Sequence, residues 1–162
     1  MTEIPSVTPN ETLEQRNKRI VLEAFDALFN KRDYVKAKTY WSPDYIQHAS
    51  HLAPGRDGLF DVVRSAPDTM GHEAGLIMAE GDFVMVHSRF GNDGRPDDLG
   101  SYPRWVAVDI LRLENGVLVE HWDVIQPEAT SKTSLSGFPM FGDAFPDGPH
   151  MRPPSSEMRQ DS

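Results

Sequence analysis

Apolar residues near the start of the chain recur every three or four positions, the spacing of one face of an α-helix. The residues in this pattern are Ile20, Val21, Ala24, Phe25, Leu28 and Phe29. Just before them, Thr12 and Gln15 stand three residues apart, as in a capping box at a helix start. The pattern predicts a first helix over about residues 13–30, with one apolar stripe packed inward.

Two shorter helices are predicted next, with a short extended segment between them. The helices cover residues 34–41 and 57–65, and the extended segment covers residues 45–48. Asp33 is suited to cap the first of these helices, and the proline shortly after its end stops it.

Beyond residue 70 the period changes to the alternation that is typical of β-strands. The predicted strands cover residues 75–79, 83–90, 104–113 and 117–126. Asn115-Gly116 between the last two is a strong hairpin signal, and residues 91–103 form a long polar loop. Helices followed by strands predict an α+β fold, with the helices over one face of a curved antiparallel sheet.

The two ends of the chain differ from its middle, since both are polar and rich in proline. Residues 1–12 are expected to form a flexible arm, and residues 146–162 a disordered tail. One domain over residues 13–145 fits a length of 162 residues.

Charge and composition exclude several classes of function. The net charge of -9 argues against nucleic acid or an anionic membrane as a partner. The absence of cysteine excludes disulfides, thiolate metal sites and cysteine nucleophiles. No signal peptide or membrane-spanning apolar run is visible, so we expect a cytoplasmic protein.

Polar residues that are suited to acid–base chemistry stand in the last two predicted strands. Alternation places His121 and Asp123 on one face with Val119 and Ile125, and Trp122 and Val124 on the other. Asp109 is flanked by apolar residues in the preceding strand, and the simplest hairpin register is expected to bring it to the same side. Such groups are costly among apolar neighbours unless they are paired, hydrated or functional. A structural His–Asp pair that holds the two strands together is the alternative.

Two further histidines are candidates for the same concavity. His48 follows the second helix in the extended segment, and His87 lies in the second predicted strand. Taken singly, each is better explained by a structural or exposed position than by a role in the pocket. His51 and His72, placed in loops, are assigned no role.

No cofactor or metal is expected. His121 and Asp123 with a distant histidine have the spacing of a two-His-one-carboxylate iron site, but a two-residue motif is common by chance. Phosphate-binding glycine loops and the serine-nucleophile signature are absent from the sequence.

The order of these elements, with Tyr45-Ile46-Gln47-His48 and the block Val106–Gln126, resembles the SnoaL-like polyketide cyclase family. This family belongs to the nuclear-transport-factor-2-like superfamily. The resemblance covers about Leu13–Gln126. It implies a cone-shaped α+β barrel, in which a strongly curved mixed sheet wraps around helices and leaves an apolar pocket open at one end.

The resemblance also implies roles for particular residues. In the cyclases of this family, an Asp two residues after a His on the last long strand is the general acid/base, and it matches Asp123 beside His121. A second pocket residue lies three residues before an Arg on the preceding strand. That Arg matches Arg112, so the pocket residue is Asp109. The antibiotic-pathway cyclases have a His there, which weakens the case for the same aromatic-polyketide substrate.

We therefore expect a cofactor-free acid/base enzyme that acts on a small apolar carbonyl compound, as an aldol-type cyclase or isomerase. Asp123 would be the acid/base, with His121 and Asp109 orienting it or sharing its proton. His48 and His87 would position substrate oxygens, and the apolar wall would be formed by Tyr45, Trp41 and Phe25.

Two alternatives stay open on the same fold. One is a non-catalytic ligand-binding or dimerisation module, and the other is a dehydratase or hydrolase. The family implies a homodimer, for which the outer sheet face offers an apolar interface. Its residues are Val106, Val108, Ile110, Trp122 and Val124.

Overall fold

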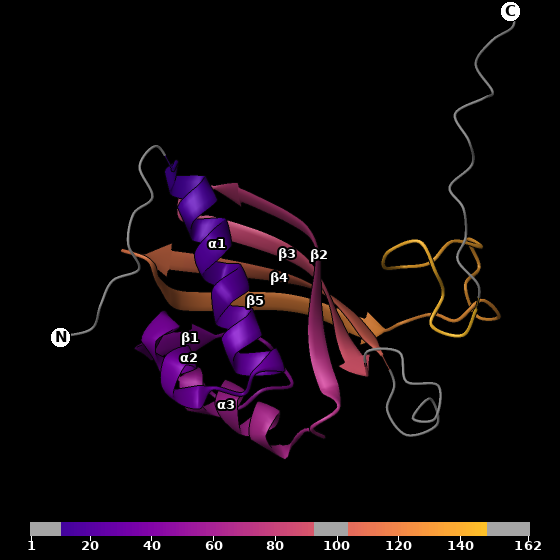
Figure 1. Cartoon of the computed structure of the whole chain (residues 1–162), viewed down its shortest axis with the longest axis horizontal. Helices are drawn as coiled ribbons and strands as arrows, with labels where there is room; N and C mark the ends of the chain where they lie inside the picture. The colour runs from indigo at the N-terminus through magenta and orange to yellow at the C-terminus, as the bar shows by residue number, and fades with distance from the viewer. Residues whose placement is uncertain (1–10, 93–103, 149–162) are drawn as a thin grey trace, which may run out of the picture.

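The computed structural model describes residues 11–92 and 104–148 (Figure 1). Most of the predicted arm, all but three residues of the predicted tail, and residues 93–103 of the predicted loop lie outside the described residues. Residues 91 and 92 belong to a strand, so the expected loop begins later than the sequence indicated.

The first predicted helix is present over its full length, but its last turn is wider. It consists of α1 (Leu13–Phe25) and a π-helical turn, η1 (Asp26–Asn30). Thr12 and Gln15 form the expected capping box, in which each side chain accepts a hydrogen bond from the other residue's backbone N–H. None of the described helices is long and apolar enough to cross a membrane.

The second helix, α2 (Tyr34–Tyr40), leads directly into a strand, β1 (Trp41–Gln47). Asp33 caps α2 as predicted, because its side chain accepts from the Lys36 N–H at 3.0 Å. The sequence prediction of a short extended segment at 45–48 was wrong in extent. Pro43 is tolerated inside β1 because this strand lies at the edge of the sheet.

The third helix, α3 (Gly55–Ser65), begins two residues before its predicted start. Gly58 is required there, since a Cβ at this position would lie 2.1 Å from the carbonyl oxygen of Ala53. The loop after β1 therefore packs closely against the first turn of α3.

The five strands form one sheet in the order β1-β5-β4-β3-β2. The remaining strands are β2 (Met70–Glu80), β3 (Phe83–Asn92), β4 (Trp105–Glu114) and β5 (Val117–Pro127). Neighbouring strands are antiparallel, except that β1 runs parallel to β5. The sheet is therefore mixed, and β2 starts five residues earlier than the sequence predicted.

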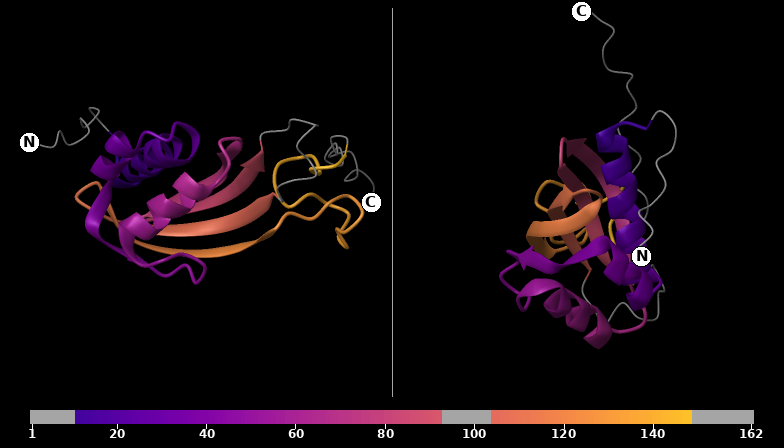
Figure 2. Two further views of the ribbon diagram at one scale, coloured as in Figure 1. Left: turned by 90° about the horizontal axis from the view of Figure 1, so that it is seen from below. Right: turned by 90° about the vertical axis from the view of Figure 1, so that its left-hand side faces the viewer.

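The helices lie on the concave face of the curved sheet, as the two views in Figure 2 show. The core between the two layers includes Trp41 and Phe60, which are at most 1% exposed and meet edge to face at 5.7 Å. Burying a side chain of this size contributes about 2–3 kcal/mol. The α+β class expected from the sequence is confirmed, with three helices packed against a five-stranded mixed sheet.

Candidate functional site

The register between β4 and β5 changes along the hairpin. Asn115 and Gly116 both have positive φ, 50° and 81°, as a tight two-residue turn requires. Next to the turn, Glu114 pairs with Val117. Farther along, Val119 has no partner in β4, so that it forms a β-bulge and the register shifts by one residue.

This bulge brings two carboxyl groups together. In the register set by the turn alone, Asp109 would lie opposite Trp122 and would share its face. The extra residue instead places Asp109 opposite Asp123. The two acids therefore lie close together, as predicted. However, the bulge brings them together, and the simplest hairpin register would have kept them apart. The predicted alternation was also wrong at one position, because Leu118 rather than Val119 is fully buried.

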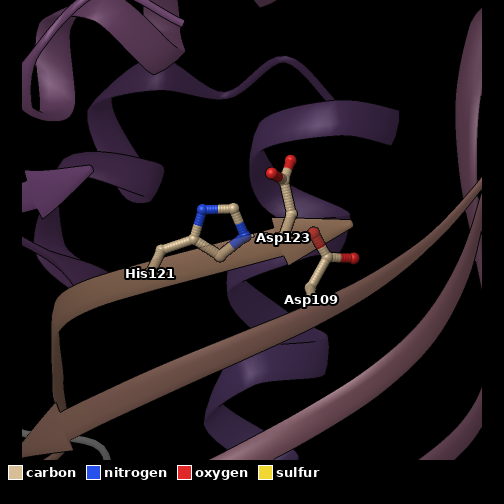
Figure 3. Close-up of side chains that lie close together, drawn as sticks. All are labelled: Asp109, His121 and Asp123. Atoms are coloured by element: carbon tan, nitrogen blue, oxygen red, sulfur yellow. Dashed lines mark hydrogen bonds and ion pairs between the residues drawn. The ribbon is translucent and has the colours of Figure 1, made fainter. Parts of the chain in front are cut away.

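Asp109, His121 and Asp123 form a tight cluster on the concave face, rising toward one another from two neighbouring strands (Figure 3). His121 Nε2 lies 3.1 Å from Asp109 Oδ1. One ligand-type atom from each of the three residues lies within 4.8 Å of the others. Asp109 and His121 are only 4% and 6% exposed, so this polar contact is largely shielded from bulk solvent.

The cluster lines a cavity of about 480 Å³ between the sheet and the helices. Aromatic and aliphatic side chains form most of its wall, and its polar residues gather near the cluster. The lining includes Phe25, Phe29, Trp41, Tyr45, Leu52, Leu59, Val62, Val63, Met70, Phe90, Trp105, Leu111 and Ile125. The predicted wall residues Phe25, Trp41 and Tyr45 therefore all lie at the cavity.

Asp123 is the acid of the cluster whose carboxyl group makes no hydrogen bond to the described residues. Burial raises the pKa of its carboxyl group, and the nearby charge of Asp109 raises it further. The histidines 121 and 51 act in the opposite direction and only partly offset the effect. Among the described residues, the Asp123 side chain has no hydrogen-bond partner, so its oxygens are available to a ligand in the cavity.

Tyr45 presents the other polar group of the aromatic wall. Burial raises the pKa of its hydroxyl far above the ordinary value, against the smaller lowering effects of the Trp41 and Gln47 side chains nearby. The Tyr45 hydroxyl therefore stays protonated and is placed to donate a hydrogen bond inside the cavity.

Two histidines that the sequence analysis set aside lie at or beside the cavity. His51 lines it, and its Nε2 is 3.8 Å from Asp123 Oδ2. His72 lies in β2 rather than in a loop and is hydrogen-bonded to Ser88 Oγ at 3.0 Å. Its ring contacts Phe25, Phe29 and Phe90 behind the wall. His72 was predicted to lie in a loop because the strand was expected to begin at residue 75. A strand that begins at residue 70 includes it.

His48 is not at the cavity. Its ring stacks on Trp122 at 4.8 Å on the opposite side of the sheet, and its Nε2 lies 2.8 Å from Glu120 Oε1. The physical reason is strand alternation in β1, which turns Tyr45 and Gln47 inward and His48 outward. The expectation that His48 lines the pocket is therefore corrected.

His87 is also absent from the cavity lining. It lies on the outer face of β3, where its ring contacts Phe141 at 5.2 Å. Phe141 is buried there, and its ring also carries the Arg89 guanidinium at 4.7 Å. The segment after β5 thus folds back over this part of the sheet, and His87 supports that packing instead of lining the pocket.

The cluster has donor atoms that a divalent metal ion would accept, namely two carboxylates and an imidazole. However, the contact between His121 Nε2 and Asp109 already uses the nitrogen that faces the cavity. A metal ion would have to break this contact. The observed contact therefore fits a pair, His121 and Asp109, that shares a proton.

Solved structures with the same fold come from several kinds of protein. The proposed hydroxylase AclR from Streptomyces galilaeus is 28% identical, with a TM-score of 0.54, over 68% of this chain and 88% of that one. A proposed ketosteroid isomerase from Kribbella flavida is 18% identical, with a TM-score of 0.58, over 71% of this chain and 81% of that one. An epoxide hydrolase from M. tuberculosis is 14% identical, with a TM-score of 0.53, over 76% and 90%.

The likeness to the isomerase and the epoxide hydrolase is a likeness of fold alone, an NTF2-like α+β cone. No match to a curated protein sequence was found. The family model for SnoaL-like polyketide cyclases matches residues 19–132, which include both edge strands and the whole cluster. The chain therefore belongs to the SnoaL-like polyketide cyclase family.

Proposed function

We propose that the protein is a cofactor-free acid–base enzyme that acts on a small, neutral carbonyl compound, as an aldol-type cyclase or isomerase. One observation carries the proposal: Asp123 is a desolvated carboxyl group, with a raised pKa and no hydrogen-bond partner among the described residues, in an apolar cavity. A carboxyl group whose pKa is raised toward neutrality can both remove and return a proton.

The proposed reaction begins with proton removal from a carbon next to a carbonyl group. The Asp123 carboxylate takes this proton, and the electron pair moves into the carbonyl to give an enolate. The Tyr45 hydroxyl donates a hydrogen bond to the enolate oxygen, which stabilises the developing charge. His51, at the edge of the cluster, is the second group placed to contact a substrate oxygen.

The second half of the reaction closes the ring in a cyclase. The enolate carbon attacks another carbonyl of the same molecule and forms the new carbon–carbon bond. The alkoxide that results takes the proton from Asp123, which restores the carboxylate. In an isomerase the same proton would return to a different carbon. In both cases atoms and charges balance without an added reagent.

The test measures exchange of α-protons of neutral aryl ketones in D₂O by NMR, since this first step does not depend on the natural substrate. Asp123→Asn should abolish the exchange while leaving quenching of Trp41 and Trp105 fluorescence by the same ketones unchanged. It should also raise the free energy of unfolding at neutral pH, because it removes a desolvated charge. Asp44→Asn, at an exposed position in β1, is the matched control.

The same experiment separates the competing functions. A non-catalytic binding module would quench fluorescence but show no exchange in the wild type, and this result would refute the proposal. The likeness to AclR makes hydroxylation a second candidate. It would appear as oxygen consumption with the same ketones and an added two-electron reductant, measured with an oxygen electrode.

The proposal extends to a homodimer through the outer face of the sheet. Val108, Ile110 and Val124 are 36%, 37% and 74% exposed, and Val108 pairs with Val124 across the strands. Such a set of neighbouring apolar side chains is suited to pack against a second copy. Val106, expected to be part of this surface, is buried at 6% exposure.

A further inference from the structure

Gln47 connects the edge strand β1 to the acid cluster. In the parallel ladder between β1 and β5, Gln47 is the register partner of His121. The ladder is fixed next to this pair by the His48 N–H, which donates to the His121 carbonyl oxygen at 2.9 Å. The two side chains therefore lie side by side, and His121 Nδ1 is 2.7 Å from Gln47 Oε1.

The orientation of the Gln47 amide follows from a second contact. The backbone N–H of Ala49 lies 3.0 Å from Gln47 Oε1, and a backbone N–H can only donate. The atom that faces Ala49 must therefore be the amide oxygen, since a flipped amide would set its NH₂ group against this donor. The same oxygen faces His121 Nδ1, and an amide oxygen only accepts. His121 therefore carries a hydrogen on Nδ1.

This assignment limits the states of the neighbouring contact between His121 Nε2 and Asp109 Oδ1. With Nδ1 protonated, one proton is shared in that contact. It lies either on Asp109, beside a neutral imidazole, or on Nε2, as an imidazolium beside a carboxylate. In both states the pair has no net charge.

The opposite tautomer would change the charge of the site. If Nδ1 were bare and Nε2 carried the hydrogen, the imidazole would be neutral and Asp109 would be an ionised carboxylate. The pair would then have one negative charge, directly across the strand from Asp123. Two like charges in a cavity with few polar groups repel each other strongly, which would oppose the ionised form of Asp123 that removes a proton.

We propose that Gln47 is a positioning residue that holds a hydrogen on His121 Nδ1, so that the His121–Asp109 pair stays neutral beside Asp123. The role in turnover rests on the proposed function, whereas the location of the hydrogen does not. Gln47 thereby leaves Asp123 as the single carboxyl group of the cluster that exchanges protons with a substrate.

The first test is the tautomer itself, measured by ¹⁵N NMR of histidine-labelled protein at neutral pH. The His121 signals are identified as those lost in His121→Gln. Wild type should show a protonated Nδ1. Gln47→Leu removes the acceptor, so its His121 should shift to the form with a bare Nδ1 and a hydrogen on Nε2.

Gln47→Glu is the conservative variant that keeps the test decisive if Gln47→Leu does not fold. Its carboxylate can accept from both His121 and Ala49, as the Gln47 amide oxygen does. His121 should therefore keep its Nδ1 hydrogen in this variant. Gln126→Leu, at an exposed position in β5, is the matched control and should leave the His121 signals unchanged.

The second test is kinetic. In the ketone exchange assay, Gln47→Leu should lower kcat about tenfold to a hundredfold, as is typical of residues that fix a histidine tautomer, with a smaller effect on KM. A bare Nδ1 in the wild type, or an unchanged tautomer in Gln47→Leu, would overturn the inference. Absence of exchange in the wild type with the expected NMR pattern would refute the proposed function and leave the tautomer assignment supported.

Discussion

Acid should destabilise the fold through His72, which lies behind the aromatic wall of the cavity. Burial lowers the pKa of His72 from its ordinary value of 6.5 to about 4, although nearby acids, first of all Asp109, act in the opposite direction. The ring contacts Phe25, Phe29 and Phe90, so the side chains that bury it are apolar. The folded chain therefore does not bind a proton that the unfolded chain binds.

The size of the effect follows from these two values. Because the folded-state pKa lies below the unfolded one, the stability is fully present above about pH 6.5 and is lost as the pH falls to about 4. Each pH unit in this interval removes about 1.4 kcal/mol, so the total loss is about 3 kcal/mol. This is a large share of the free energy of unfolding of a typical domain, about 5–15 kcal/mol.

Urea unfolding of the wild type and of His72→Leu, followed by tryptophan fluorescence over this pH range, measures the loss. Leucine cannot titrate, so the difference between the two curves separates His72 from other groups that respond to acid, such as Asp26, whose pKa is lowered. Loss of the hydrogen bond to Ser88 shifts the variant equally at every pH. The variant should lose about 3 kcal/mol less than the wild type. Equal losses would mean that water reaches His72 in the folded state and would refute the reasoning.

Gly116→Ala should lower the free energy of unfolding in urea by about 1–2 kcal/mol, because φ is 81° and a Cβ would lie 3.3 Å from Cδ1 of the buried Ile20. Gly81→Ala, at φ 55° with nothing within 4 Å, should cost less, and equal costs would refute the contact argument. Ile110→Lys combined with Val124→Lys should halve the mass in light scattering and leave ketone binding intact; an unchanged dimer mass would place the interface elsewhere. Metal analysis of the purified protein should find far less than one transition metal ion per chain, and chelation should leave the melting temperature unchanged. About one iron or zinc ion per chain that is lost in Asp109→Ala would overturn the acid–base mechanism.

The parts of the fold that the sequence predicted well depend on short-range signals. The capping box at Thr12 and the Asn115-Gly116 turn are each encoded within four residues, and both are present in the structure. Strand alternation also placed Asp123 and Trp122 on opposite faces correctly, because it acts within one strand. His121 and Asp123 could therefore be grouped from the sequence alone, whereas Asp109 was added to them through a hairpin register that the bulge at Val119 changes.

The features that were missed depend on pairing between distant residues. Ile46 pairs with Glu120 in a parallel ladder, and the residues around Ile46 contain no signal that indicates this partner. Without it, β1 was predicted only as a short extended segment, and His48 was placed in the pocket. Alternation within β1 would have favoured Gln47 instead. The bulge at Val119 is another non-local feature, since it is defined only by the strand opposite.

The polar atoms of the site divide into those satisfied by the protein and those left to the cavity. His121 is held on both sides, by Gln47 and by Asp109. A pair of this kind is sufficient to join two strands, so a purely structural role would need nothing more. Asp123 adds a third polar group that is desolvated and, among the described residues, not hydrogen-bonded, and its charged form costs stability. Since packing and strand pairing gain nothing from this carboxyl group, we propose that its position serves a ligand that exchanges a proton with it.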